Sequence, residues 1–280
     1  MTQRMIDPGK PSIESPVRAP EAHVLKQCCA RAYETEVARW LLGDSFHPGG
    51  LALTERLGVQ LNLRAADRVL DVASGRGTSA LFLAERFGCG VTGIDLGPES
   101  VASAEAEALA RGLSDRVSFR QVDAESLPFQ DGAFDALLCE CAFCTFPDKA
   151  RAAHEFARVL RPNGRVGLSD LTRVSELPPE LDELLAWIAC IADAQPTERY
   201  TECLRNAGFV IQTIESHREA LQAMVRQVRG RLLAADVMRG LKKIELPEVS
   251  LAAARSLATF AAGAIARGEL GYALITAAKR

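Results

Sequence analysis

The sequence predicts a single α/β domain built on one largely parallel sheet with helices on both of its faces. Strand and helix patterns alternate from residue 68 onward, and a glycine-rich turn follows the first strand. Strands that alternate with helices form parallel sheets covered on both sides. The chain has 280 residues, 48% hydrophobic and 25% charged, an ordinary globular composition that can bury a full core. We therefore expect one folded domain over residues 21–280.

The first 63 residues predict a flexible lead-in followed by helices. Residues 1–20 contain four prolines and lack the apolar stretch of a secretory signal, which predicts a flexible terminus. Residues 21–43 have apolar positions at helical spacing, and Gly43 is a stop signal. A second helix is expected over 51–61, which completes an N-terminal helical region over 21–63.

The ligand-binding core is predicted over residues 64–217, where short apolar runs alternate with helical patterns. The predicted strands are 68–73, 91–95, 117–123, 134–140, 164–171 and 209–217, and the predicted helices are 78–88, 99–112, 148–161 and one near 179–194. Helical patterns then form an insert over 218–268 before a last strand at 269–279. The insert is expected to cap the pocket or to form a dimer surface.

Glycines and carboxylates at the ends of the first strands predict a nucleotide-like ligand. Gly75 and Gly77 let the backbone turn tightly and approach a ligand closely. Asp95 ends the second predicted strand, where a carboxylate can accept both hydroxyls of a ribose, and Asp123 ends the third. The ends of successive parallel strands meet above the sheet, where open α/β sheets bind ligands.

The glycine spacing alone leaves two other interpretations open. Gly75-x-Gly77-x-x-Ala80 fits a plain tight turn and also matches the fingerprint of nicotinamide dinucleotide sites. Two features argue against the dinucleotide: the acidic Asp71 in the strand that leads into the turn, and the run DAESLPFQDGAFD after the third strand.

Together these motifs resemble the class I S-adenosylmethionine-dependent methyltransferases over about residues 68–172, where LPFQDGAFDALLC and FARVLRPNGRVGLSDL are typical. The resemblance implies a Rossmann-like sheet with an antiparallel last strand, and S-adenosylmethionine as cofactor with S-adenosylhomocysteine as product. Ala73 departs from the family's usual first glycine, which affects the fine geometry of the methionine end. The implied cofactor-binding residues are Asp71, Ala73, Gly75, Gly77, Thr78, Asp95, Leu96, Asp123, Ala124, Glu125 and Cys139.

Eight cysteines are many for a chain of this size, and their positions need an explanation. Cys139, Cys141 and Cys144 lie at the end of the fourth predicted strand, where the acceptor would meet the cofactor's methyl group. Plain packing is the usual role of a buried thiol. Structural zinc favours four ligands, and Cys141-x-x-Cys144 supplies half of that pattern. A soft, thiophilic acceptor is the third interpretation. Cys89 and Cys203 are expected to be small fillers.

The segment CAFCTFPDK, which begins at Cys141, resembles the corresponding segment of arsenite methyltransferases, and the sequence around Cys190 is similar to that family's second cysteine segment. The resemblance implies that Cys141 and Cys190 hold trivalent arsenic, with Cys144 and Cys29 as further thiol ligands or redox partners and no resident metal. The role of the adjacent Cys28 stays open. Arsenic itself is the nucleophile, so no general base is needed, and glutathione or thioredoxin would act as the thiol reductant.

Other acceptors stay open at this point. Sulfide or a small thiol fits the same soft pocket, and His47 is a candidate base for a carbon or oxygen acceptor. A metalloid sensor without turnover is a further alternative. The net charge of -3, the pI near 5.9 and the absence of a basic run argue against a nucleic-acid partner. No apolar run reaches the ~18 residues of a membrane span, so we expect a cytoplasmic protein that acts on a small molecule or a metalloid.

Overall fold

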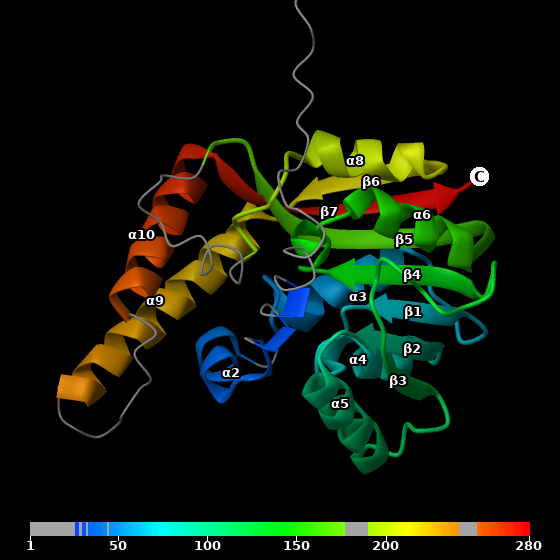
Figure 1. The fold of residues 1–280 in the computed structure, drawn as a ribbon, viewed down its shortest axis with the longest axis horizontal. Coiled ribbons are helices and arrows are strands. Elements are labelled where there is room, and N and C mark those ends of the chain that lie inside the picture. Colours follow the sequence, from blue (N-terminus) through cyan, green and yellow to red (C-terminus); the bar gives the residue numbers. More distant parts are fainter. Residues whose placement is uncertain (1–25, 28–29, 32, 44, 177–189, 241–250) are drawn as a thin grey trace, which may run out of the picture.

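The computed structural model describes residues 26–27, 30–31, 33–43, 45–176, 190–240 and 251–280. Its centre is a seven-stranded sheet in the order β3-β2-β1-β4-β5-β7-β6 (Figure 1). The strands are β1 Arg68–Val72, β2 Gly90–Asp95, β3 Val117–Gln121, β4 Phe134–Glu140, β5 Leu160–Arg173, β6 Phe209–Ser216 and β7 Leu270–Lys279. All pairs are parallel except those of β7, which runs antiparallel to β5 and β6. The predicted fold class is therefore confirmed.

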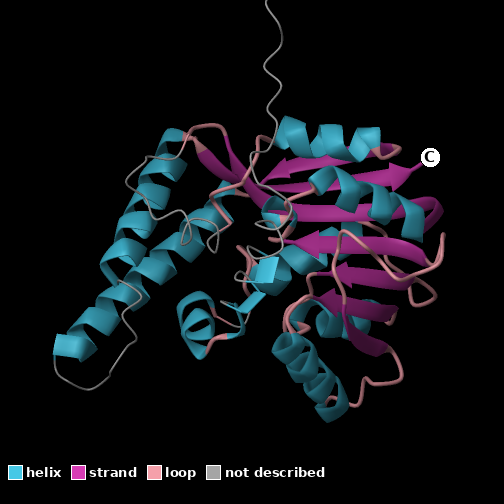
Figure 2. Ribbon diagram, viewed as in Figure 1, coloured by secondary structure: helices cyan, strands magenta, loops and turns pink. Residues whose placement is uncertain are grey.

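Helices cover the sheet on both faces (Figure 2). They are α2 Glu36–Leu42, α3 Gly50–Gln60, α4 Thr78–Phe87, α5 Pro98–Ala110, α6 Lys149–Val159, α8 Thr197–Asn206, α9 Arg218–Gly240 and α10 Leu251–Arg267, with a 3-10 turn η1 at Phe143–Thr145. Two separate hydrophobic cores result, one beneath α3, α4 and α5 and the other beneath α6 and α8. Strand alternation divides β4 between them: Leu138 packs into the first core, whereas Leu137 and Cys139 pack into the second.

The N-terminal region differs from the single long helix expected over 21–43. Helical backbone reaches Glu34, Thr35 is extended, and a new helix, α2, then starts at Glu36. The Thr35 hydroxyl accepts a hydrogen bond from the Ala38 backbone N–H at 3.1 Å, a capping role that competes with a continuous helix. Gly43 ends α2 with a φ of 95°, as expected from its place in the sequence.

The predicted insert is a helical pair that leaves the sheet and lies beside α2 (Figure 1). Arg231 of α9 donates to the Leu41 carbonyl at 2.8 Å, which ties the pair to the N-terminal region. Another difference is at β3, which ends at Gln121, so Asp123 lies beyond the strand. The helix expected near 179–194 falls mostly on 177–189, outside the described residues.

Packing of Phe119 explains two glycines near the first strand ends. A Cβ on Gly77 would lie 2.4 Å from the Phe119 ring, and one on Gly93 would lie equally close. Gly77 also has a φ of 79°, a left-handed conformation that side chains disfavour. The absence of side chains at these two glycines allows β2 and the start of α4 to pack directly against the Phe119 ring.

We expect Gly77→Ala to lower the free energy of unfolding by about 3 kcal/mol, because overpacking adds to backbone strain. Gly112→Ala is the matched control: its φ is 66°, but the space around it is empty to 4 Å. Strain alone predicts a loss of about 1 kcal/mol there. Urea unfolding of both variants measures the difference, and equal losses would contradict the packing argument.

Candidate active site

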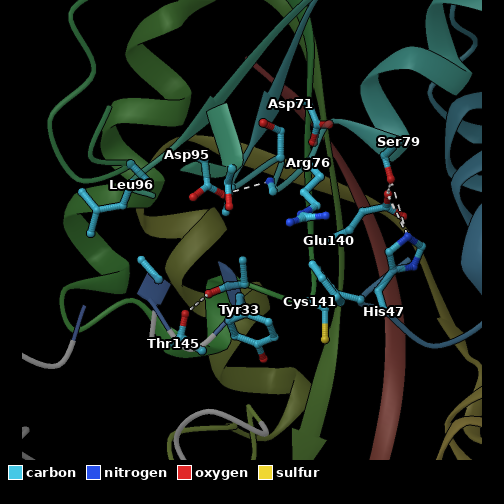
Figure 3. Close-up of a pocket in the computed structure, with 18 of the residues that line it drawn as sticks. Tyr33, His47, Asp71, Arg76, Ser79, Asp95, Leu96, Glu140, Cys141 and Thr145 are labelled. Atoms are coloured by element: carbon cyan, nitrogen blue, oxygen red, sulfur yellow. Dashed lines mark hydrogen bonds and ion pairs between the residues drawn. The ribbon is translucent and has the colours of Figure 1, made fainter. Parts of the chain in front are cut away.

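A pocket opens at the carboxyl ends of β1, β2 and β4, where strand ends and their loops meet (Figure 3). The N-terminal segment forms the opposite wall through Lys26, Tyr33, Phe46 and His47. No described residue of α9 or α10 lines the pocket, so in the part of the chain that the structure describes the insert contacts α2 and does not cap the site.

Asp95 joins the two loops that form the floor of the pocket. One carboxylate oxygen accepts the Gly75 backbone N–H and the other accepts the Gly97 backbone N–H, each at 2.8 Å. Burial raises the pKa of Asp95, and these two hydrogen bonds oppose that rise. A carboxylate has about four acceptor positions, so Asp95 can still accept hydroxyls from a ligand.

The turn before α4 holds backbone conformations that favour glycine. Gly75 has a φ of 53°, and Ala73 adopts 57° although it carries a methyl group. Both residues line the pocket, as do Arg76 and Thr78. Gly77 does not line it, because it packs against Phe119 in the core behind the turn.

Two buried polar atoms on the pocket wall have no hydrogen-bond partner among the described residues. They are Asp71 Oδ2 and Ser74 Oγ. Burial raises the pKa of Asp71 well above its usual range, and the nearby Glu140 and Asp95 raise it further. Unsatisfied buried groups are costly, so this arrangement indicates a ligand that carries a donor or a positive charge.

The charges on the pocket wall fit a ligand that carries both positive and negative groups. Asp71, Asp95, Asp123 and Glu140 all line the pocket and favour a cationic centre. Arg76 is a cation on the same wall, 3.5 Å from Glu36, and can pair with a ligand carboxylate. A sulfonium, an amino group and a carboxylate on one molecule match this pattern.

The adenine end expected at Asp123 lies beside the N-terminal segment. Leu96, Asp123 and Ala124 line the pocket. Glu125 does not; it is buried and accepts the Asp148 backbone N–H at 2.9 Å. It also accepts the ammonium of Lys26. Glu125 therefore supports the wall from behind.

Of the three cysteines near the end of β4, only Cys141 lines the pocket. Cys139 points into the hydrophobic core on the α6 side, because alternation along β4 puts it on the face opposite Glu140. Cys144, in η1, is buried behind the pocket. Cys28 and Cys29 lie outside the described residues, where their expected roles stay predictions.

The thiols of Cys141, Cys144 and Cys190 interact with one another beneath Tyr33. The Tyr33 hydroxyl lies 3.3 Å from the Cys190 sulfur. Hydrogen bonds from Cys141 and then Cys144 lower the pKa of Cys190. The pKa of Cys141 is raised by its hydrogen bond to Cys190 and by burial, and the pKa of Cys144 is raised by burial and by its hydrogen bond to Cys190. Cys190 is therefore the most acidic thiol of the cluster.

Backbone geometry directs two of these cysteines. Cys141 has a φ of 53° and Cys190 a φ of 60°, uncommon values outside glycine that mark functional sites. Arg173 holds the turn after Cys190 by donating to the carbonyls of Ile191 at 3.1 Å and Ala192 at 2.9 Å. All six described cysteines are free, and within the described ranges no group of three or more His, Cys, Asp or Glu could hold a metal ion.

A polar cluster around Glu140 was not expected from the sequence. Glu140 accepts hydrogen bonds from Ser79 at 2.7 Å and Thr54 at 3.0 Å, and His47 Nε2 lies 3.7 Å from its carboxylate (Figure 3). The available signal was a carboxylate at the end of an otherwise apolar strand, FDALLCE. The sequence contained no indication that Tyr33 and Lys26 reach the pocket, because only the fold brings their segment there. Arg76 lies within the predicted glycine turn, but nothing in the sequence indicated that its side chain lines the pocket.

Fold and pocket together define an S-adenosylmethionine-dependent methyltransferase. Residues 63–208 match the family described as "Methyltransferase domain", and the chain belongs to that family. The residues present fit the cofactor: Asp71 and Ser74 offer unsatisfied polar atoms, and the carboxylates complement its sulfonium. Among the described residues, no helix has the length and apolar character needed to span a membrane.

Curated relatives act on varied acceptors. The chain is 30% identical over 231 residues to 27-O-demethylrifamycin SV methyltransferase of Amycolatopsis mediterranei, covering 81% of this chain and 82% of that protein. It is 28% identical over 226 residues to O-methyltransferase resE of Aspergillus sclerotiorum, covering 80% of each chain.

Solved structures share the fold. The [4+2]-cyclase SpnF superimposes with a TM-score of 0.74 at 25% identity, over 92% of this chain and 95% of that chain. Haemonchus contortus phosphoethanolamine N-methyltransferase 2, solved with S-adenosylhomocysteine, gives a TM-score of 0.74 at 20% identity, over 91% of this chain and 60% of that chain.

We expect Asp71→Asn to stabilise the free protein and weaken cofactor binding. The raised pKa means that the folded state holds the Asp71 proton more tightly than the unfolded chain, so wild-type stability falls as pH rises from the ordinary aspartate pKa through the raised one. The variant should gain about 1–2 kcal/mol near pH ~8 and lose this advantage toward pH ~4.

Urea unfolding at several pH values measures the gain, and calorimetry should show S-adenosylmethionine binding about tenfold weaker. A variant that is less stable than wild type at high pH, or that binds the cofactor equally well, would contradict the assignment of Asp71 as a strained ligand-binding carboxylate.

Proposed function

We propose that the enzyme methylates a soft, thiophilic acceptor, foremost trivalent arsenic, held by the sulfur atoms of Cys141 and Cys190. One observation carries this proposal: the thiols of Cys141 and Cys144, which follow β4, interact with the thiol of Cys190 from a separate segment, and Cys141 lies on the pocket wall. Soft thiolates prefer soft centres such as trivalent arsenic.

The thiol cluster suits capture of arsenite. Each As–S bond that forms replaces an As–OH bond, and the thiol proton and the hydroxide leave together as water. Cys190, the most acidic thiol of the cluster, is the first ligand, and Cys141, which lines the pocket, is the second. Cys144 is a third sulfur within the same cluster.

S-adenosylmethionine, when bound, supplies an electrophilic methyl group and leaves as S-adenosylhomocysteine. The protein's part is alignment of the arsenic lone pair and exclusion of water. Tyr33 and Phe46 cover the site with ring centroids 5.6 Å apart, and Phe143 and Tyr200 pack behind it. No general base is required, since arsenic in this state has no proton to lose.

The surroundings implied by this reaction are a reducing cytoplasm and a thiol reductant. Glutathione or thioredoxin would return arsenic and any oxidised cysteines to the reduced state. A small thiol or sulfide is the neighbouring acceptor class, because it would use the same soft pocket without metalloid ligation.

A hydroxyl acceptor is the second candidate, and His47 favours it. The imidazole lies on the pocket wall with Nε2 3.7 Å from the Glu140 carboxylate, a partner that can orient a base. The relatives named for O-methylation lend this candidate support.

We expect purified enzyme with S-adenosylmethionine, glutathione and arsenite to form methylated arsenic. Cys141→Ser and Cys190→Ser should each lower the rate about 100-fold or more, since hydroxyls are poor ligands for arsenic and alignment is lost. Cys203→Ser is the matched control, because Cys203 lies half-buried on α8, outside the cluster. Mass spectrometry separates the products.

Two results would contradict the arsenite proposal. One is cofactor binding without any methylated arsenic, with product forming on sulfide or on a small thiol. The other is unchanged arsenite methylation in both serine variants.

His47→Gln tests the hydroxyl candidate. Loss of a general base should reduce methylation of a phenolic or alcoholic acceptor panel about 100-fold, while arsenite methylation stays near the wild-type rate. An effect on arsenite methylation and on cofactor affinity together would assign His47 to the cofactor end of the pocket and exclude the role as acceptor base.

A further inference from the structure

Lys26 forms an ion pair with Asp123, the carboxylate that is expected to bind the amino group of the cofactor's adenine. Its ammonium lies 2.9 Å and 3.2 Å from the two oxygens of Asp123, and 2.5 Å from Glu125. Both Lys26 and Asp123 line the pocket, and the Lys26 side chain is only 13% exposed. The Asp123 side chain is 36% exposed, so water screens only part of this ion pair.

An ammonium and an adenine amino group compete unequally for a carboxylate. Both bonds gain from the charge of the Asp123 carboxylate, but only the ammonium adds a direct charge–charge attraction, because the exocyclic amine of adenine is neutral. Asp123 Oδ1 already accepts the Glu125 backbone N–H at 2.9 Å, which leaves few positions for a second donor while Lys26 is present.

We propose that Lys26 sets the affinity and the base selectivity of the cofactor site by competing with the adenine amino group for Asp123. When the cofactor binds, Lys26 releases Asp123 and stays paired with Glu125, whose other oxygen remains on the Asp148 backbone N–H. The inference depends on S-adenosylmethionine being the cofactor and is independent of the acceptor.

The segment that carries Lys26 has separate anchors, so the ion pair can open without detaching the wall. Glu34 accepts the backbone N–H groups of Glu99 at 2.8 Å and Ser100 at 3.2 Å at the start of α5. This contact replaces the cap that Gly97, without a side chain, does not supply. Neither Glu34 contact involves Asp123.

The test measures binding by calorimetry with two probes, S-adenosylhomocysteine and its inosine analogue, which lacks the amino group. The wild-type protein should bind the two probes with similar affinity, because Lys26 competes with the adenine amino group for Asp123. Lys26→Met should bind S-adenosylhomocysteine about tenfold tighter than wild type while the inosine analogue changes little, so that discrimination rises about tenfold. Lys26→Arg, which keeps the charge, should behave like wild type.

Glu34→Gln is the matched control, because it loosens the same segment without altering the charge at Asp123. Thermal melts without ligand confirm that the variants fold. The proposal is overturned if Lys26→Met binds S-adenosylhomocysteine more weakly, if both probes change by the same factor, or if Glu34→Gln reproduces the gain in discrimination.

Discussion

The pair of hydrogen bonds accepted by Asp95 determines the shape of the site. One oxygen holds Gly75 in the turn after β1, and the other holds Gly97 at the start of α5. Two loops that follow different strands are thereby fixed relative to each other, and the strand ends become one continuous floor. Burial raises the pKa of this carboxyl group, and these backbone donors offset part of that rise.

The same floor concentrates negative charge at a cost in stability. Asp71 lies near Glu140 and Asp95 in a buried position, and its Oδ2 has no hydrogen-bond partner in the part of the chain that the structure describes. Such strain persists at functional sites when a ligand relieves it. A cationic sulfonium cofactor complements this field, and its neutral-sulfur product complements it less, which favours release after transfer.

The N-terminal segment links the two ends of the pocket. Lys26 lies at Asp123, and Tyr33 lies over the cysteine cluster. A single stretch of chain therefore touches both the site expected for adenine and the site proposed for the acceptor. Two kinds of chemistry line the pocket near the end of β4, soft sulfur at Cys141 and polar groups at His47 and Glu140.

The sequence by itself determined the sheet, the order of its elements and most of the cofactor end. Apolar periodicity and glycine turns are local signals, so β1, β2, α4 and the insert helices appeared close to their predicted bounds. Tertiary structure alone decided which side chains meet. Because side chains alternate along β4, Cys139 lies in the core and Glu140 faces α3 and α4. Gly77 packs against Phe119 and therefore does not line the pocket. Lys26 and Tyr33 join the pocket from a distant segment, which the sequence did not indicate because contacts across a folded chain have no periodic pattern.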